Sequence, residues 1–172
     1  MLKFKAVIFD VDDTILDNKH TEVGNSLHER SRLRAVRMVG QEEGIEALEK
    51  VTLQENLDAF LTAYEHSTTA TVWNLLKMKG LVTGAMAEED NDLFRKIVRL
   101  KNEIHEKILL EEAEPIPGAI EFINALASGG LEGKLAVASS AIRREIELFF
   151  SKAGIDQHFP GDQIKSREDS KY

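Results

Sequence analysis

The stretch that decides the fold is Phe4-Lys5-Ala6-Val7-Ile8-Phe9-Asp10-Val11-Asp12-Asp13-Thr14-Ile15-Leu16-Asp17. Its apolar run, residues 6–9, is short, β-branched and aromatic, which predicts a buried strand. Four carboxylates follow that run, at Asp10, Asp12, Asp13 and Asp17. Carboxylates repel one another and resist burial, so a cluster at a strand end commonly has a cation or a phosphoryl group to offset it. We therefore expect the functional site here.

The segment Phe9-Asp10-Val11-Asp12-Asp13-Thr14 resembles the first motif of the haloacid dehalogenase superfamily, hydrophobic-Asp-x-Asp-x-Thr after the first strand of an α/β core. The resemblance implies that Asp10 is a nucleophile that forms an aspartyl-phosphate and that Asp12 is the general acid and base. It also implies that Thr14 positions Asp12 in the phosphate site, and that Mg²⁺ is bound by Asp10 and by the Asp12 carbonyl. The dehalogenase branch lacks the second acid, so phosphoryl chemistry is favoured.

Two other interpretations of this stretch are a calcium-binding loop and a structural turn. In a calcium loop of the EF-hand type, Asp10, Asp12 and Thr14 would be the first, third and fifth positions. That pattern also needs Gly at the sixth position and Glu at the twelfth, where the chain has Ile15 and Thr21. The second interpretation is a structural turn after a strand, capped by its polar residues.

The composition is that of an acidic chain with enough apolar residues for a packed core. Of 172 residues, 42% are hydrophobic and 30% are charged, and the formal net charge is −8. The negative charge argues against nucleic acid as a partner, because phosphate backbones attract basic surfaces. The chain has no cysteine, and it has no apolar run of the ~20 residues that cross a membrane. We expect a cytoplasmic protein without a membrane partner.

Residues 24 to 114 show helical patterns and no strand pattern. The expected helices cover about 24–42, a stretch capped by Thr52, about 69–79, and a long stretch after Glu88, Glu89 and Asp90. The resemblance implies that this block is a helical cap inserted after the first motif. The expected fold is an α/β, Rossmann-like parallel-sheet core formed by residues 1–17 and 115–172, with a four-helix cap formed by residues 18–114.

A second candidate segment is Lys134-Leu135-Ala136-Val137-Ala138-Ser139-Ser140. It predicts a strand that ends in a hydroxyl pair and is followed by a helix. Two serines before a helix are typical N-caps. The resemblance implies that Ser139, in the family's second motif, hydrogen-bonds the transferring phosphoryl group near helix N-terminal amides. Ser140 is a second phosphate-binding candidate and the expected N-cap.

Three arginines stand out in the expected cap. Arg30, Arg34 and Arg37 are separated by four and three residues, so they share one face of a helix. Such a stripe can recognise an anionic substrate. The alternative is a solvated face whose charges pair with acids such as Glu29.

The family pattern is incomplete toward the C-terminal end. Residues 159–165 resemble the segment that leads to the third motif, where the family places a lysine that is often followed by proline. No Lys-Pro pair occurs here, and the candidates are Lys165 and Lys171, both of which also fit solvated surface lysines. The acidic pair of the fourth motif does not appear before Tyr172. We expect a fragment of a larger enzyme, the alternative being a natural short form that binds but turns over poorly.

These observations predict Mg²⁺-dependent hydrolysis of a small phosphorylated metabolite, a phosphate monoester, through an aspartyl-phosphate. One alternative is a phosphomutase of the same superfamily, which uses the same intermediate but excludes water. Another is a non-catalytic module that binds phosphate esters. The sequence identifies neither the ester nor the oligomeric state.

Overall fold

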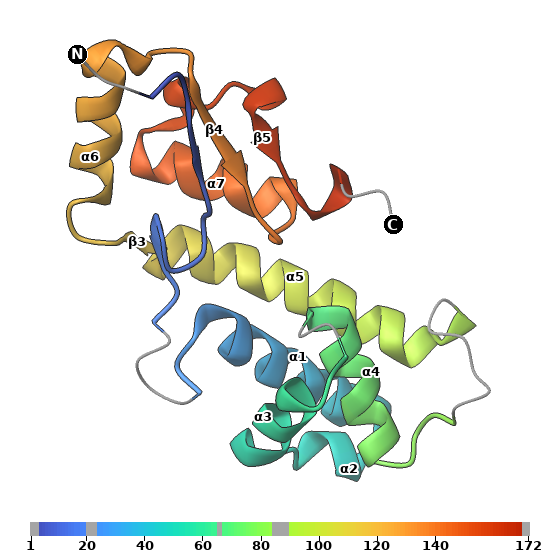
Figure 1. Ribbon diagram of the computed structural model, residues 1–172. Helices are drawn as coiled ribbons and strands as arrows, with labels where there is room; N and C mark the ends of the chain where they lie inside the picture. The colour runs from blue at the N-terminus through green and yellow to red at the C-terminus, as the bar shows by residue number, and fades with distance from the viewer. Residues whose placement is uncertain (1–3, 20–23, 65–66, 84–89, 170–172) are drawn as a thin grey trace. The chain divides into compact units, whose positions relative to one another are not determined.

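The computed structural model describes residues 4–19, 24–64, 67–83 and 90–169 (Figure 1). The chain divides into two compact units. One comprises Met1–Asn18 and Leu109–Tyr172, and we call it the α/β unit; the other comprises Lys19–Ile108, and we call it the helical unit. Glu88, Glu89 and Lys171, which the sequence analysis named, lie outside the described residues.

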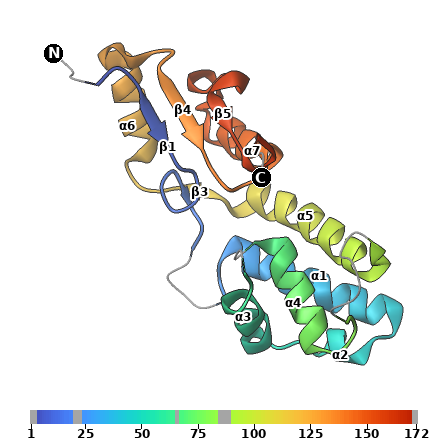
Figure 2. The same ribbon diagram turned by 45° about the vertical axis from the view of Figure 1, so that its right-hand side comes forward.

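The α/β unit is built on a parallel sheet of three strands in the order β1-β4-β5 (Figure 2). The strands are β1 (Val7–Phe9), β4 (Leu135–Ala138) and β5 (Ile164–Lys165). In their register, Phe9 lies opposite Val137, and Val137 lies opposite Ile164. This sheet confirms the predicted α/β class.

The helices of this unit are α6 (Ala119–Leu126), the end of α5 and α7 (Arg143–Ala153). A π-helical turn, Ala127–Leu131, and the 3-10 turns Asp156–His158, Gly161–Gln163 and Arg167–Asp169 complete it. Aromatic rings connect these elements: the Phe9 ring meets those of Phe122 and Phe159 edge to face, and Phe159 lies 4.8 Å from Phe150 between ring centroids. Phe150 and Phe159 are buried, whereas Phe122 is 56% exposed, so the buried part of this cluster joins α7 to the segment after it.

Strand β1 is less buried than the sequence predicted. Val7 and Phe9 are half-buried, and the side chain of Ile8 is 70% exposed. The expectation of a buried strand is wrong because, within the described residues, β1 lies at the edge of the sheet and pairs with β4 alone. An apolar run in the sequence does not distinguish an edge strand from a central one.

A short antiparallel ribbon lies where the chain passes between the two units. It pairs β2 (Leu16–Asp17) with β3 (Glu114–Pro115), with Leu16 opposite Pro115. The Ile116 N–H extends the pairing by donating to the Ile15 carbonyl at 2.8 Å. The ribbon thus ties the segment that leaves the acidic loop to the segment that returns after α5.

The helical unit contains α1 (Leu27–Glu43), α2 (Glu46–Glu49), α3 (Leu53–Leu61), α4 (Thr68–Met78) and most of α5 (Asp92–Glu112). The four predicted helices are present among the described residues, and α2 is an additional single turn. Gly44 ends α1 at φ 67°, a left-handed conformation that favours glycine. Thr52 caps α3 in a capping box with Glu55, as its sequence indicated. Among the described residues, no helix has the length and apolar character to cross a bilayer.

Candidate active site

The two candidate segments meet at one edge of the parallel sheet. Asp10 follows the last residue of β1, and Ser139 follows the last residue of β4. These strands are parallel neighbours with Phe9 opposite Val137, so their carboxyl ends lie side by side. The Ser139 N–H donates to the Lys165 carbonyl at 2.9 Å, which brings the end of β5 to the same edge. Ligands of parallel α/β sheets bind at this edge.

Asp10 is placed for contact with a ligand. Its side chain is exposed, and its Oδ1 accepts a hydrogen bond from the Val11 N–H at 2.7 Å. This bond fixes one carboxylate oxygen against the backbone. The second oxygen, Oδ2, is the one available to a phosphorus atom or a cation.

The loop after Asp10 is wound around one carbonyl. The N–H groups of Thr14, Ile15 and Leu16 all donate to the Val11 carbonyl, at 3.2, 2.9 and 2.9 Å. Asp13 adopts φ 56°, a left-handed conformation that is uncommon outside glycine but tolerated by Asp. The tight turn presents Asp13 and Thr14 to solvent and leaves Asp12 half-buried.

The structure identifies Asn18 as a site residue that the sequence analysis missed. Its side-chain Nδ2 donates to Asp12 Oδ1 at 2.9 Å, and its backbone N–H donates to Asp13 Oδ1 at 3.2 Å. Asn18 is 1% exposed, and its own Oδ1 is buried without a partner among the described residues. The position is polar and directly follows the Leu16–Asp17 strand, but its burial could not be inferred from the sequence.

Ser139 and Ser140 differ in their roles from the expectation. The Ala141 N–H donates to Ser139 Oγ at 3.2 Å, which folds the chain back after β4 and leaves the hydroxyl hydrogen available. Ser140 is exposed and is not the N-cap of α7. That prediction is wrong: the helix begins at Arg143, with Ile142 at the N-cap position.

A distant acid caps α7 instead. Glu168 Oε2 accepts from the Arg143 N–H at 2.9 Å. The Arg143 guanidinium donates to the carbonyls of Gly161 and Ile164 and to Asp169 Oδ2, at 2.9, 2.7 and 2.9 Å. These bonds tie the segment after α7 to the helix start and hold β5 beside Ser139.

Asp169 is the most strongly perturbed carboxyl of this network. The N–H and the hydroxyl of Ser166 each donate to its Oδ2 at 2.9 Å. These hydrogen bonds, followed by the one from Arg143, lower the pKa of Asp169 to about 2. The carboxylate is therefore ionised at all physiological pH values.

The third-motif lysine stays a prediction. The Lys165 side chain is exposed, and only its backbone carbonyl is seen to contact the site, through Ser139. Lys171 lies outside the described residues.

The donors that could hold a cation at this edge are oxygen atoms. They are the Asp10 carboxylate and the backbone carbonyl of Asp12. Oxygen donors are the set that Mg²⁺ prefers, so the residues present fit that ion.

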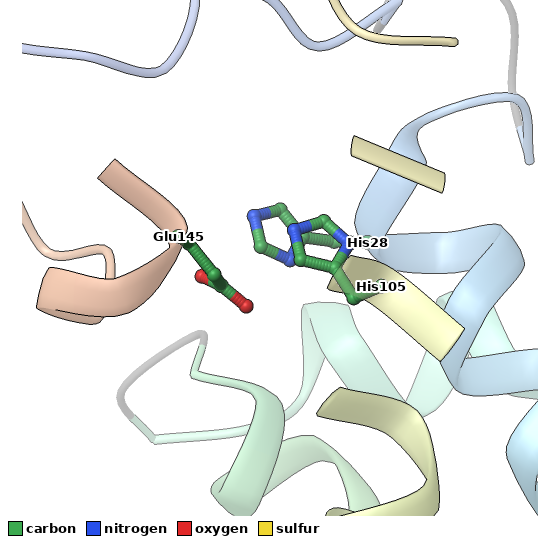
Figure 3. Close-up of side chains that lie close together, drawn as sticks. All are labelled: His28, His105 and Glu145. Carbon is green, nitrogen blue, oxygen red and sulfur yellow. The ribbon is translucent and has the colours of Figure 1, made fainter. Parts of the chain in front are cut away.

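The helical unit contains a separate titratable pair. The rings of His28 and His105 stack with 4.0 Å between centroids and an angle of 19° (Figure 3). Burial, with the nearby charge of Lys101, lowers the pKa of His105 to about 3. His105 is therefore neutral at pH 7, and the two rings can stack without charge repulsion from that side chain.

The chain was compared with known protein families and curated sequences. A family model described as hydrolase, haloacid dehalogenase-like hydrolase, matches residues 4–171. No curated protein sequence matches.

Three solved structures resemble the chain over nearly its whole length. A predicted phosphoglycolate phosphatase from Haemophilus somnus 129PT gives a TM-score of 0.65 at 17% identity, covering 100% of this chain and 66% of that one. A protein from Lactobacillus delbrueckii subsp. bulgaricus, provisionally described as a phosphoglycolate phosphatase, gives a TM-score of 0.56 at 16% identity. The match covers 96% of this chain and 65% of that one. A hydrolase from Pseudomonas syringae gives a TM-score of 0.56 at 17% identity, and the match covers 96% of this chain and 62% of that one. The chain thus spans less than two thirds of these structures, and at such identities the likeness shows the fold.

Proposed function

Because the chain belongs to the haloacid dehalogenase-like hydrolase family, we propose that it forms part of a phosphatase that hydrolyses a small phosphate monoester. The observation that carries the proposal is the position of Asp10. Its exposed carboxylate follows β1 at the carboxyl edge of a parallel sheet, where Ser139 follows the neighbouring strand. A nucleophile and a hydroxyl donor at one sheet edge fit transfer of a phosphoryl group.

In the proposed reaction, Asp10 Oδ2 attacks phosphorus and the bond from phosphorus to the ester oxygen breaks. Asp12 gives its proton to the leaving oxygen, so an alcohol departs and an aspartyl-phosphate remains on Asp10. The Asp12 carboxylate then takes a proton from water, which attacks the same phosphorus. Inorganic phosphate leaves, and the Asp10 carboxylate is regenerated.

Ser139 fits the role of a phosphate ligand. Its Oγ accepts a hydrogen bond from the Ala141 N–H, so its own hydroxyl hydrogen points away from that N–H. That hydrogen can be donated to an equatorial phosphoryl oxygen. Ser140 and Thr14 are exposed hydroxyls on the two segments at the same edge and are proposed as further phosphate-binding groups.

The proposed cofactor is Mg²⁺, held by the Asp10 carboxylate and the Asp12 backbone carbonyl. When bound, this ion supplies positive charge that offsets the charge of the phosphoryl oxygens and of Asp10. Oδ1 accepts from the Val11 N–H, so Oδ2 is the oxygen that we propose for the attack on phosphorus.

We also propose that the helical unit, Lys19–Ile108, is the cap that selects the substrate. The support is its insertion between the acidic loop and the return of the chain to the sheet, across the β2–β3 ribbon. The proposed substrate is a small phosphorylated metabolite of the cytoplasm. The net charge of −8 supports that class over nucleic acid.

The test is hydrolysis of an aryl phosphate with and without Mg²⁺, on this chain and on any longer product of its gene. Asp10→Asn should reduce the release of inorganic phosphate at least ~10³-fold, because it removes the nucleophile. Asp162→Asn is the matched control, since Asp162 is exposed in the same unit and outside the candidate site. Phosphoglycolate is a second substrate to try, prompted by the name of the Haemophilus somnus protein.

Equal activity of the Asp10→Asn and Asp162→Asn variants would overturn the proposal. If no form releases phosphate, binding of beryllofluoride to Asp10 becomes the deciding measurement, because it mimics the aspartyl-phosphate without turnover. A form of the protein that binds beryllofluoride but moves a phosphoryl group between two positions of one sugar would be a phosphomutase. No binding in any form would leave a non-catalytic role.

A further inference from the structure

A surface depression of about 350 Å³ lies along α1 of the helical unit. Arg30, Arg34 and Arg37 line it, so the arginine stripe seen in the sequence faces one concave surface. The other lining residues are Leu33, Met38, Gln41 and Glu49. The volume is at the lower end of the ~300–1,000 Å³ typical of small-molecule sites.

Arg34 and Arg37 lack the carboxylate partner that several other cations of the helical unit have. Ion pairs join Lys50 to Glu46, Lys79 to Glu55, Lys96 to Glu42 and Glu43, Arg95 to Asp92, and Arg99 to Glu103. Neither Arg34 nor Arg37 has a carboxylate partner within the part of the chain that the structure describes. In a chain with a net charge of −8, two uncompensated guanidinium groups in one depression form a local anion-attracting surface.

Arg37 is held in position by the protein. Its Nε donates to the Val51 carbonyl at 2.8 Å, between the single-turn helix α2 and the start of α3. That bond fixes the plane of the guanidinium and leaves its two terminal nitrogens for a ligand. A guanidinium fixed in this way loses less side-chain entropy on binding than a mobile lysine does.

Leu33 and Met38 supply the apolar part of the lining. Leu33 is half-buried, and Met38 is 43% exposed. Glu49 is the single acid against three arginines, so the lining keeps an excess of positive charge. The combination of an apolar wall with fixed guanidinium groups fits a ligand that has an apolar body and an oxyanion head.

We propose that this depression binds an organic oxyanion with a flat apolar body, such as an aromatic carboxylate. Arg34 and Arg37 hold the anionic group, and the body lies against Leu33 and Met38. The site is built from residues of the helical unit alone and does not depend on the proposed hydrolysis.

The experiment is a titration of the full chain with 1-naphthoate, followed by calorimetry and by amide NMR of α1. A carboxylate probe is used because a phosphate ester would also report on the Asp10 site. Arg34→Gln should weaken binding at least ~3-fold, and Arg34→Gln/Arg37→Gln about tenfold, with a further loss at high salt. Arg34 is exposed and makes no hydrogen bond or ion pair with the described residues, so its variant should test the site without a change in fold.

Arg99→Gln is the matched control, since Arg99 is an exposed arginine on α5 of the same unit. It should bind 1-naphthoate as the unmodified chain does. Equal affinity for 1-naphthalenemethanol, which lacks the charge, would overturn the proposal. So would equal weakening by Arg99→Gln, or saturation without shifts of the α1 amides.

Discussion

At the scale of single residues, the contact between Asn18 and Asp12 has the clearest consequence for chemistry. One oxygen of the Asp12 carboxyl accepts from Asn18 Nδ2 at 2.9 Å. A proton on this carboxyl is therefore directed to the other oxygen, Oδ2. In the proposed reaction, Asn18 is thus a positioning residue, because it orients the group that exchanges protons with the leaving oxygen and with water.

This contact makes a prediction that rests on the proposed hydrolysis. Asn18→Ala should lower kcat about tenfold and leave KM within about twofold, because the bond orients the acid and does not bind substrate. Asn18→Asp should move the pH profile of kcat upward, because a second carboxylate beside Asp12 raises the pKa of that acid. Steady-state kinetics across pH measure both effects.

Asn124→Ala is the control for the Asn18 variants. Asn124 lies on α6 of the same unit and bonds with its Oδ1 to His158 at 2.8 Å, away from the acidic loop. A rise in KM without a change in kcat for Asn18→Ala would contradict the positioning role. An unchanged pH profile for Asn18→Asp would contradict it as well.

Arg32 shows how far a residue can depart from what its type suggests. This arginine is almost fully buried in the helical unit, its Nε donates to Asn56 Oδ1 at 2.8 Å, and its guanidinium lies 5.6 Å from the centre of the Phe60 ring. Burial, opposed in part by the charge of Glu29, lowers its pKa to about 10. Arg32 remains charged at pH 7. An amide and an aromatic ring face its guanidinium, while one terminal nitrogen is buried without a hydrogen-bond partner among the described residues.

At the scale of elements, the close approach of α1 to α2 depends on one glycine. A Cβ built on Gly40 would lie 2.3 Å from the Glu49 backbone nitrogen and 2.8 Å from the Leu48 side chain. These neighbours belong to the backbone of α2 or to a fully buried leucine, so they have little freedom to move. Gly40 is therefore required for packing, although glycine is a poor helix former.

Gly40→Ala should lower the free energy of unfolding by about 1–3 kcal/mol, because the overpacking exceeds the gain in helix propensity. Gly44→Ala is the comparison. A Cβ there meets no atom within 4 Å, and the cost of about 1–2 kcal/mol comes from φ 67° alone. Urea denaturation gives both values. If the Gly40 variant were as stable as the unmodified chain, the α1–α2 contact would be looser than the structure shows.

The helix boundaries show which element signals are local. Ser26, Thr52 and Ser67 each accept from an N–H three residues later, so these helix starts depend on polar residues nearby in the sequence. Of the three caps, the sequence analysis identified Thr52. The start of α7 could not. Its first N–H is satisfied by Glu168, which is distant in sequence, and the nearby serines have no part in that cap.

At the scale of the whole molecule, the two units contain different acid-sensitive groups. In the helical unit, the pKa of His105 is lowered to about 3, so its imidazole is neutral when folded and takes up a proton below about pH 6.5 when unfolded. The contribution of neutral His105 to the free energy of unfolding is complete above pH 6.5 and is lost progressively as the pH falls toward 3. In the α/β unit, Asp169 has a pKa of about 2, and its contribution is lost only below about pH 4.

The helical unit should therefore lose stability before the α/β unit as the pH falls. Its free energy of unfolding should decrease by up to ~1.4 kcal/mol per pH unit below pH 6.5, and His105→Gln should reduce this slope. Urea denaturation between pH 4 and 8, with hydrogen exchange to separate the units, measures it. His158→Gln, at a half-buried histidine of the α/β unit, is the control and should leave the slope of the helical unit unchanged. Equal slopes in all three proteins would show that His105 is not the group that titrates.

The sequence alone determined the features that depend on neighbouring residues. The apolar run before Asp10, the helical spacing of residues 24 to 114 and the caps at Thr52 and Gly44 are all encoded within a few positions. A hydrogen bond to the next turn, or a side chain on the same face, depends on short spacings along the chain. The α/β class and the helices between residues 24 and 114 could therefore be predicted.

Only the tertiary structure decided which distant residues meet. It placed Ile8 on an exposed edge, gave the cap of α7 to Glu168, brought the rings of His28 and His105 together, and set Asn18 against Asp12. The hollow surface around Arg34 and Arg37 likewise depends on α2 and on the carbonyl of Val51. Each of these features depends on packing between segments far apart in the chain, and the identity and spacing of nearby residues carry no record of that packing.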